Sequence, residues 1–295
     1  MTRIEEFGWR GPVEPGLGRI VSAHGDYYHL VCNETGGEIL ARKKKSAFRK
    51  RIADVREVGC ERRVTRTETE GEELQPMTGD FVRFRYNPQG ESMVTELLPR
   101  FSHFERRDKN ARRRVQTLAV NFDTLFVMMS LNGNFSVARA ERFLDLAADM
   151  GEAEAVVVVT KTDLKVPGDE SRLAELEAAV AGRARIIGLS SKTGEGLERV
   201  LEYVRPGRTV AFLGSSGVGK STLVNVLAGE EWMAVGEIQD WSGKGRHTTT
   251  SRELVRLPSG ALVLDTPGVR EIGRMDETED VLVKGESTHR WRRKG

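Results

Sequence analysis

The sequence predicts a small all-β barrel followed by an α/β domain, and two observations support this prediction. Residues 15–100 carry short β-like runs separated by glycine-containing turns, with no long helical period among them. Residues 116–275 alternate apolar strand candidates with helical stretches, which is typical of a layered α/β domain with a largely parallel sheet. The 295 residues of the chain are enough for both domains.

The first domain, residues 15–100, is expected to be an OB-like barrel. Its five strand candidates are residues 19–23, 27–31, 38–41, 81–86 and 92–97. Five short strands with turns between them suit a small barrel of the OB type. The polar stretch 62–75 is expected to be a long exposed loop.

A basic connector, residues 101–115, is expected to lead into the α/β domain, residues 116–275. Strand candidates in that domain are residues 124–130, 155–160, 185–189, 209–213, 253–257 and 261–264, and helical stretches lie near 136–150, 171–181, 195–204 and 219–228. Residues 276–295 have no apolar period, so we expect them to form a poorly ordered tail.

Composition argues against several classes of protein. No run approaches the ~20 apolar residues of a membrane span, and the first residues lack the apolar core of a signal peptide. Cys32 and Cys60 are too few for a disulfide framework or a four-thiolate metal site. We therefore expect a soluble cytoplasmic protein without a membrane partner.

A phosphate-binding loop is predicted between the strand 209–213 and the helix 219–228. The segment fits the pattern GxxxxGK[ST] in full and comprises Gly214, Ser215, Ser216, Gly217, Val218, Gly219, Lys220 and Ser221, with Thr222 next in the helix. Glycines let backbone N–H groups converge on phosphate oxygens at the positive end of the helix. Lys220 is predicted to contact the β- and γ-phosphates and to assist catalysis, and Ser221 to ligate Mg²⁺.

Two further segments predict the rest of a Mg²⁺ and γ-phosphate site. Asp265 follows the strand 261–264, where a carboxylate can hold Mg²⁺ through water, and the Gly268 amide can contact a γ-phosphate. Within residues 245–250, Thr249 is the predicted switch threonine, which ligates Mg²⁺ when a γ-phosphate is present. Taken alone, these segments would be interpreted as a surface turn and a polar loop.

Guanine is the predicted base. Asp163, just beyond the strand 155–160, can accept the adjacent N1–H and N2–H₂ donors of guanine, a pair that adenine lacks. The predicted base-reading residues are Thr160, Lys161, Thr162 and Asp163, followed at the next strand end by Ser190, Ser191 and Lys192. Thr160 stands where this motif usually has asparagine, so the loss of an amide puts some nucleotide affinity in doubt.

The order of these motifs is circularly permuted. A GTPase normally runs from the phosphate loop through the switch threonine to the base readers, whereas here residues 160–163 and 190–192 precede the loop. Ligands bind at the carboxyl ends of the strands whatever the connectivity, so the site survives. The sequence thus predicts an α/β circularly permuted P-loop GTPase domain with an N-terminal all-β OB-like barrel.

The chain resembles the small ribosomal subunit biogenesis GTPase A family, whose members are circularly permuted. The resemblance covers residues 15–273 and rests on the barrel, on the motifs above and on the segments 98–100, 119–123, 130–135 and 265–271. It implies GTP/GDP and Mg²⁺ as ligands. It also implies the 30S ribosomal subunit and its 16S rRNA as partners, and GTP hydrolysis stimulated by that subunit during its late maturation.

The resemblance also bears on catalysis and on zinc. Val269 stands where many GTPases have a glutamine that orients water, and His247 resembles the family's candidate for that task. Relatives continue into a zinc module with three cysteines and one histidine. Here no cysteine follows Cys60 and the tail holds only His289, so zinc is not expected, and the chain is interpreted as a short form or a truncated product.

Residues 42–51 carry seven positive side chains and no acid, and we interpret them, with the basic connector, as contacts to rRNA phosphates. A monomer is expected. Three alternatives stay open. The first is an RNA-binding module that keeps GTP without hydrolysing it. The second is a P-loop ATPase or small-molecule kinase, against which Asp163 argues, and the third is a degraded gene product that folds poorly.

Overall fold

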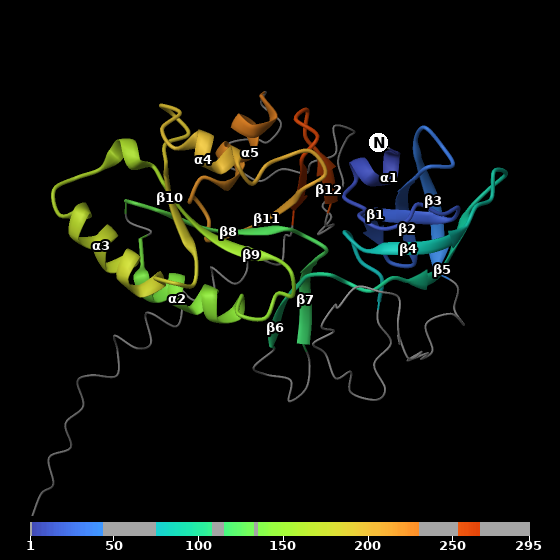
Figure 1. Ribbon diagram of the computed structural model, residues 1–295, viewed down its shortest axis with the longest axis horizontal. Helices are drawn as coiled ribbons and strands as arrows, with labels where there is room; N and C mark the ends of the chain where they lie inside the picture. Colours follow the sequence, from blue (N-terminus) through green and yellow to red (C-terminus); the bar gives the residue numbers. More distant parts are fainter. Residues whose placement is uncertain (1, 44–74, 108–114, 133–134, 230–252, 266–295) are drawn as a thin grey trace, which may run out of the picture.

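The structure is a computed structural model that describes residues 2–43, 75–107, 115–132, 135–229 and 253–265. A β-barrel and an α/β domain lie side by side (Figure 1). The predicted segments 62–74, 245–250, 266–271 and 276–295 fall outside the described residues.

The barrel consists of β1 (Leu17–His24), β2 (Tyr27–Cys32), β3 (Glu38–Lys43), β4 (Phe81–Arg85) and β5 (Ser92–Leu97). These strands pair in the order β1-β2-β3-β5-β4, and β4 pairs back onto β1, which closes the barrel. Alternate side chains point inward, and Ile20, Tyr28, Leu30 and Val94 are among those that fill the interior. The prediction of an OB-like barrel is confirmed.

The α/β domain contains β8 (Thr124–Ser130), β9 (Glu154–Thr160), β10 (Arg185–Leu189), β11 (Thr209–Leu213), β12 (Glu253–Arg256) and β13 (Leu262–Asp265). The strands lie in the order β10-β9-β8-β11-β13-β12. The first five in this order are parallel to their neighbours, and β12 is antiparallel to β13. The prediction of a largely parallel sheet is therefore confirmed.

Helices cover both faces of this sheet. They are α2 (Val137–Leu146), α3 (Asp169–Val180), α4 (Leu197–Leu201) and α5 (Lys220–Ala228), with a 3₁₀ turn, η1, at Thr162–Leu164. Helices α2 and α3 lie on one face, and α4 and α5 on the other (Figure 1). Phe143 and Leu176 pack into one apolar cluster, and Val200 and Leu223 into a second. β8 is buried along its whole length, as expected of a central strand between helical layers.

Two strands that the sequence does not predict lie between the domains. β6 (His103–Arg107) pairs antiparallel with β7 (Val115–Val120), so residues 103–107 and Val115 of the connector 101–115 lie in strands. Phe104 and Leu118 anchor this small sheet in the apolar core of the α/β domain. The short helix α1 (Arg3–Glu6), also not predicted, buries Ile4 against Leu17 and Phe81 of the barrel.

The barrel and the α/β domain share one hydrogen-bonded sheet. β1 pairs with β12 at Ser22 and Glu253, which joins the barrel strands to the six strands of the α/β domain. The two domains are therefore continuous through backbone pairing, and Val21 and Val31 of the barrel strands also pack into the apolar cluster of the α/β domain, while the barrel interior forms a cluster of its own.

Candidate nucleotide-binding site

The predicted phosphate loop connects β11 to α5 at the carboxyl edge of the sheet. Gly217 and Gly219 adopt positive φ angles of 76° and 95°, and Gly219 is the N-cap of α5. Gly214 lies so close to β8 that a Cβ there would be 2.6 Å from the Met128 carbonyl oxygen. This backbone path places the N-terminus of α5, a helix of nine residues, at the loop, and helix N-termini in this arrangement bind anions.

The loop contains polar groups suited to a phosphate. The Lys220 ammonium donates to the carbonyl oxygens of Gly214 and, at 2.7 Å, of Ser215. Within the described part of the chain, the Ser215 hydroxyl is buried and has no hydrogen-bond partner. Carbonyl oxygens are weaker partners for an ammonium than phosphate oxygens are, so Lys220 is suited to exchange them for an anionic ligand.

The predicted base-reading segment, residues 160–163, is tied directly to the phosphate loop. The Thr160 hydroxyl donates to the Val218 carbonyl at 2.6 Å, and the Met129 carbonyl lies 3.2 Å from the same oxygen. Lys161 adopts a φ of 62° and its ammonium donates to the Gly217 carbonyl at 2.9 Å. The Thr160 hydroxyl thus supplies a donor to the phosphate loop from the position where this motif usually has asparagine.

Asp163 is exposed, and a buried hydroxyl orients it. The Ser190 hydroxyl donates to Asp163 Oδ1 at 2.8 Å and accepts a hydrogen bond from the Thr193 amide at 3.1 Å. The Thr162 hydroxyl donates to Glu195 at 2.9 Å, which links the two predicted base-reading segments a second time. A carboxylate has about four acceptor positions, so one bond from Ser190 leaves Asp163 able to accept both guanine donors.

The remaining predicted residues are placed as follows. Ser216 and Lys192 are exposed, and Ser191, Ser221 and Thr222 are partly buried. Asp265 ends β13 and pairs through its backbone with Glu253 of β12. His247, Thr249 and Gly268 lie outside the described residues. The structure thus brings together residues 160–163, residues 190–192 and the phosphate loop at one edge of the sheet.

Sequence reasoning missed two supports of this site. Thr193 and Glu195 bond Ser190 and Thr162 and so hold the loop 190–192 beside residues 160–163, and the β8 carbonyl groups of Met128 and Met129 lie close to Gly214 and Thr160. A threonine and a glutamate directly after Lys192 offered a weak signal of a capped turn. The methionine carbonyls carry no sequence signal, because any residue of β8 would supply them.

Comparison with known proteins decides the family. A sequence model of the RsgA GTPase family matches residues 97–275. The chain belongs to this family. It is 39% identical over 257 residues to "Small ribosomal subunit biogenesis GTPase RsgA 2" of Lactiplantibacillus plantarum, covering 87% of this chain and 66% of that protein. It is 34% identical to the Leptospira interrogans RsgA, covering 95% of this chain and 73% of that one.

Solved structures agree with the fold. YjeQ from Thermotoga maritima superposes with a TM-score of 0.60 at 26% identity, over 87% of this chain and 76% of that one. YloQ, described as a circularly permuted GTPase, superposes with a TM-score of 0.50 at 19% identity over 85% of this chain and 70% of that one, which supports the fold alone. The permuted architecture predicted from the motif order is confirmed.

The chain spans 66% of the length of the L. plantarum relative and 55% of the Opitutus terrae relative, which is also named a small ribosomal subunit biogenesis GTPase. Among the residues that the structure describes, no three His, Cys, Asp or Glu side chains are grouped to hold a metal ion. In the same part of the chain, no helix has the length and apolar character needed to cross a membrane.

Proposed function

We propose that this chain binds GTP and GDP with Mg²⁺, hydrolyses GTP, and assists late maturation of the 30S ribosomal subunit through contacts with 16S rRNA. The observation that carries the nucleotide part is the pair of hydrogen bonds from Thr160 and Lys161 to the phosphate loop. These bonds join a phosphate-binding loop to a guanine-reading carboxylate at one sheet edge, as a guanosine triphosphate requires. We expect the protein to act as a monomer in the cytoplasm.

Each predicted residue has a role in this proposal. The loop amides and Lys220 hold the phosphates, and Asp163 with the 190–192 loop holds the base. Ser221, Thr249 and Asp265 hold Mg²⁺, which when bound neutralises charge on the phosphate oxygens. Thr249 and the Gly268 amide report the γ-phosphate, and His247 orients the attacking water, because Val269 has no polar group to do so. The residues of this site need no zinc.

The barrel supports the RNA part of the proposal. Tyr27, Leu40, Arg42 and Met93 are exposed on its outer surface, with Tyr27 opposite Arg42 and Arg42 opposite Met93 in the strand register. The Arg42 guanidinium lies 5.2 Å from the centre of the Tyr27 ring. Aromatic and arginine side chains together form platforms on which unpaired bases stack. Residues 44–51 of the basic run lie outside the described residues.

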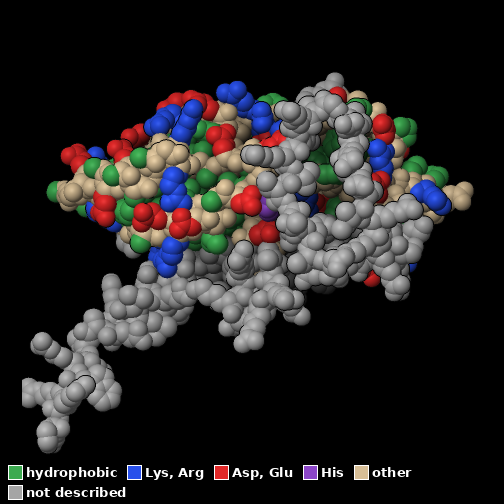
Figure 2. Space-filling model, turned by 60° about the horizontal axis from the view of Figure 1, so that its bottom comes forward, with side chains coloured by type: hydrophobic (Ala, Val, Ile, Leu, Met, Phe, Trp, Pro, Cys, Tyr) green, Lys and Arg blue, Asp and Glu red, His purple; other side chains and the backbone are tan. Residues whose placement is uncertain are grey.

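Figure 2 shows basic and acidic side chains interspersed over the described residues of the face that it presents, on the barrel as well as on the α/β domain. A mixed surface of this kind repels phosphate as much as it attracts it, so we base the RNA contact on the Tyr27 and Arg42 stacking platform of the barrel.

GTP hydrolysis by the purified chain, alone and with 30S subunits, tests the proposal. We expect slow turnover alone, because Val269 cannot position water, and a large stimulation by 30S subunits. A Lys220→Ala variant should abolish both rates. Intact GTP binding without stimulation would refute the ribosome-linked part and favour an RNA-binding module that keeps GTP as a structural ligand. Equal competition by GTP and ATP would refute guanine recognition and favour an ATPase or kinase.

A further inference from the structure

The junction between the two domains is built around a buried arginine. Arg19 of β1 has no exposed surface, and its guanidinium lies 4.7 Å from the centre of the Phe81 ring. It donates to the carbonyl oxygens of Gly79, Phe7 and Asn121, at 3.3, 2.5 and 2.6 Å, and to the Thr209 hydroxyl at 3.0 Å. Its four acceptors come from the N-terminal segment, the barrel, the strand connection before β8 and the start of β11.

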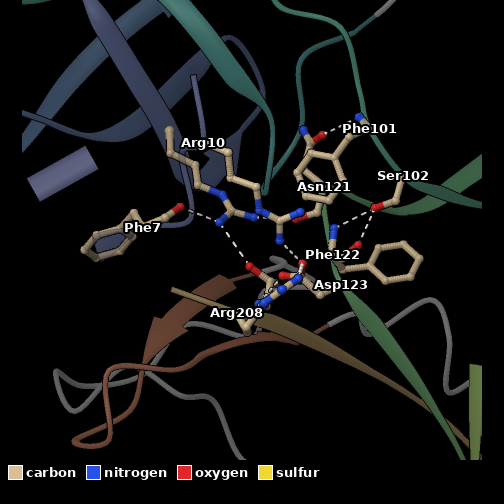
Figure 3. A network of polar contacts seen from close by, with 10 residues as sticks. Phe7, Arg10, Phe101, Ser102, Asn121, Phe122, Asp123 and Arg208 are labelled. Atoms are coloured by element: carbon tan, nitrogen blue, oxygen red, sulfur yellow. Dashed lines mark hydrogen bonds and ion pairs between the residues drawn. The ribbon is translucent and has the colours of Figure 1, made fainter. Parts of the chain in front are cut away.

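These bonds reach the strand that carries the phosphate loop. Thr209 is the first residue of β11, and the loop begins directly after Leu213 at the other end of that strand. Asp123 holds the same end of β11, because its carboxylate accepts from the Thr209 amide at 2.8 Å and from Arg208 at 2.7 Å. Figure 3 shows Arg10, Asp123 and Arg208 converging there, and Arg10 pairs with Asp123 from the N-terminal segment.

Asn121 fixes the geometry on the other side of Arg19. It is buried, adopts a φ of 52°, and its side chain accepts from the Phe101 amide at 3.0 Å and donates to the Gly79 carbonyl at 3.2 Å. A residue other than glycine in the left-handed region is held there by its surroundings. Hydrogen bonds therefore hold the junction on the barrel side as well as on the α/β side, and they restrict movement of one domain relative to the other.

A second route joins the same two regions through backbone pairing. β1, which carries Arg19, pairs with β12 at Ser22, β12 pairs with β13, and β13 pairs with β11. A displacement of β11 or β13 at the nucleotide site thus reaches β1 along the sheet, and Arg19 prevents β1 from absorbing it by tilting away from Thr209. Coupling between distant sites needs such a contiguous and rigid element.

We propose that Arg19 is a positioning residue through which nucleotide binding in the α/β domain is transmitted to the barrel. This proposal rests on the nucleotide binding proposed above. Burial is the main cause that lowers the pKa of Arg19 to about 9, with the charge of Arg10 adding to the effect and that of Asp80 opposing it. The guanidinium therefore stays charged near neutral pH, and all four of its bonds remain charge-assisted.

Hydrogen exchange in the full chain tests the proposal, with GTPγS as the probe. When GTPγS binds, the amides of the phosphate loop and α5 should become protected, and the hydrogen-exchange rates of amides in β1 and β2 should also change, by about fivefold. In Arg19→Met, the response of β1 and β2 should disappear while that of the phosphate loop persists. Arg183→Met is the matched control, since Arg183 pairs with Asp145 on the surface, and it should respond like the wild type.

The outcomes separate the two proposals. No protection of the phosphate loop in the wild type would refute nucleotide binding, and with it the coupling. Protection of the loop without any response in the barrel would refute the coupling alone, and an unchanged barrel response in Arg19→Met would refute the role of Arg19. Should Arg19→Met fail to fold, Thr209→Val takes its place, because valine keeps the shape of threonine but lacks the hydroxyl that accepts from Arg19. This variant should weaken the barrel response, and a response equal to that of the wild type would overturn the proposal.

Discussion

At the nucleotide site, Asp163 is exposed and Lys220 bonds the carbonyl oxygens of its own loop, whereas at the domain junction Asp123 and Arg19 are buried and each bonds several partners. The same chemical groups serve two purposes. The Asp163 carboxylate has free acceptor positions and the Lys220 ammonium bonds neutral carbonyl oxygens, so both can bind a charged ligand group at little cost. Buried and fully bonded side chains fix the position of the strands from which the ligand-binding loops start, because leaving any of them unpaired is costly.

The largest effect on stability should come from Asp123. Its carboxylate is 7% exposed, and Asp123→Ala leaves the buried Thr209 amide without its acceptor and removes the partner of the half-exposed Arg208, so we expect a loss of about 2–4 kcal/mol. Asp145→Ala is the control, since the Asp145 side chain is 70% exposed and its pair with Arg183 should contribute roughly 0–1 kcal/mol. Urea unfolding of both variants measures the difference. Equal losses would contradict the contrast between the buried junction and the exposed surface.

The second largest effect should fall on nucleotide choice and leave stability unchanged. In Asp163→Asn an amide group faces the guanine donors, so GTP affinity should fall by about 100-fold or more. Because the Asp163 side chain is exposed, the free energy of unfolding should hardly change. Xanthine carries a carbonyl in place of the amino group and should bind the variant better than guanine does.

Competition binding with GTP, XTP and ATP measures this change, and Asp149→Asn, at an exposed position of the same domain, is the control. A variant that loses GTP binding and thermal stability together would mean that Asp163 holds the fold, and the assignment of Asp163 as the base reader would fail.

The two regions also differ in how far the sequence predicts them. The phosphate loop and the base readers follow from contiguous motifs at strand ends, because local backbone needs select glycine, lysine and aspartate there. The junction joins Arg19 to Thr209, residues 190 positions apart, and no local pattern indicates such a contact. The β6 strand escapes sequence prediction for a related reason, since Arg106 and Arg107 directly follow its buried aromatic residue, Phe104.

A smaller effect should follow from the loop that carries Ser190. Gly196 has a φ of 75°, and a Cβ there would lie 1.9 Å from the Gly188 carbonyl oxygen, so Gly196→Ala must displace the loop from β10. We expect GTP affinity to fall by roughly 30-fold, or about 2 kcal/mol. Gly194→Ala is the matched control, because Gly194 has a φ of 82° but no atom within 4 Å of its Cβ position. Equal losses of GTP affinity in both variants would mean that the strain of a side chain at positive φ causes the effect, and that the close approach of Gly196 to the Gly188 carbonyl does not.

The smallest predicted effect concerns the bond between the base-reading segment and the phosphate loop. Thr160→Val keeps the shape of the side chain but leaves the Val218 carbonyl without its donor, which should cost about 1–2 kcal/mol of nucleotide binding, or roughly 5–30-fold in affinity. Thr160→Ser keeps the hydroxyl and should bind like the wild type. Thr95→Val removes a similar bond, to the Arg83 carbonyl, within the barrel and should not change the affinity.

Titration with a fluorescent GDP analogue measures all three threonine variants. The hydroxyl is the decisive group in this series, because valine and serine each keep one feature of threonine and lose the other. If Thr160→Ser bound the GDP analogue as weakly as Thr160→Val does, the methyl group of Thr160 would be the decisive group. The affinity of the nucleotide site would then depend on side-chain packing, as the stability of the domain junction depends on burial.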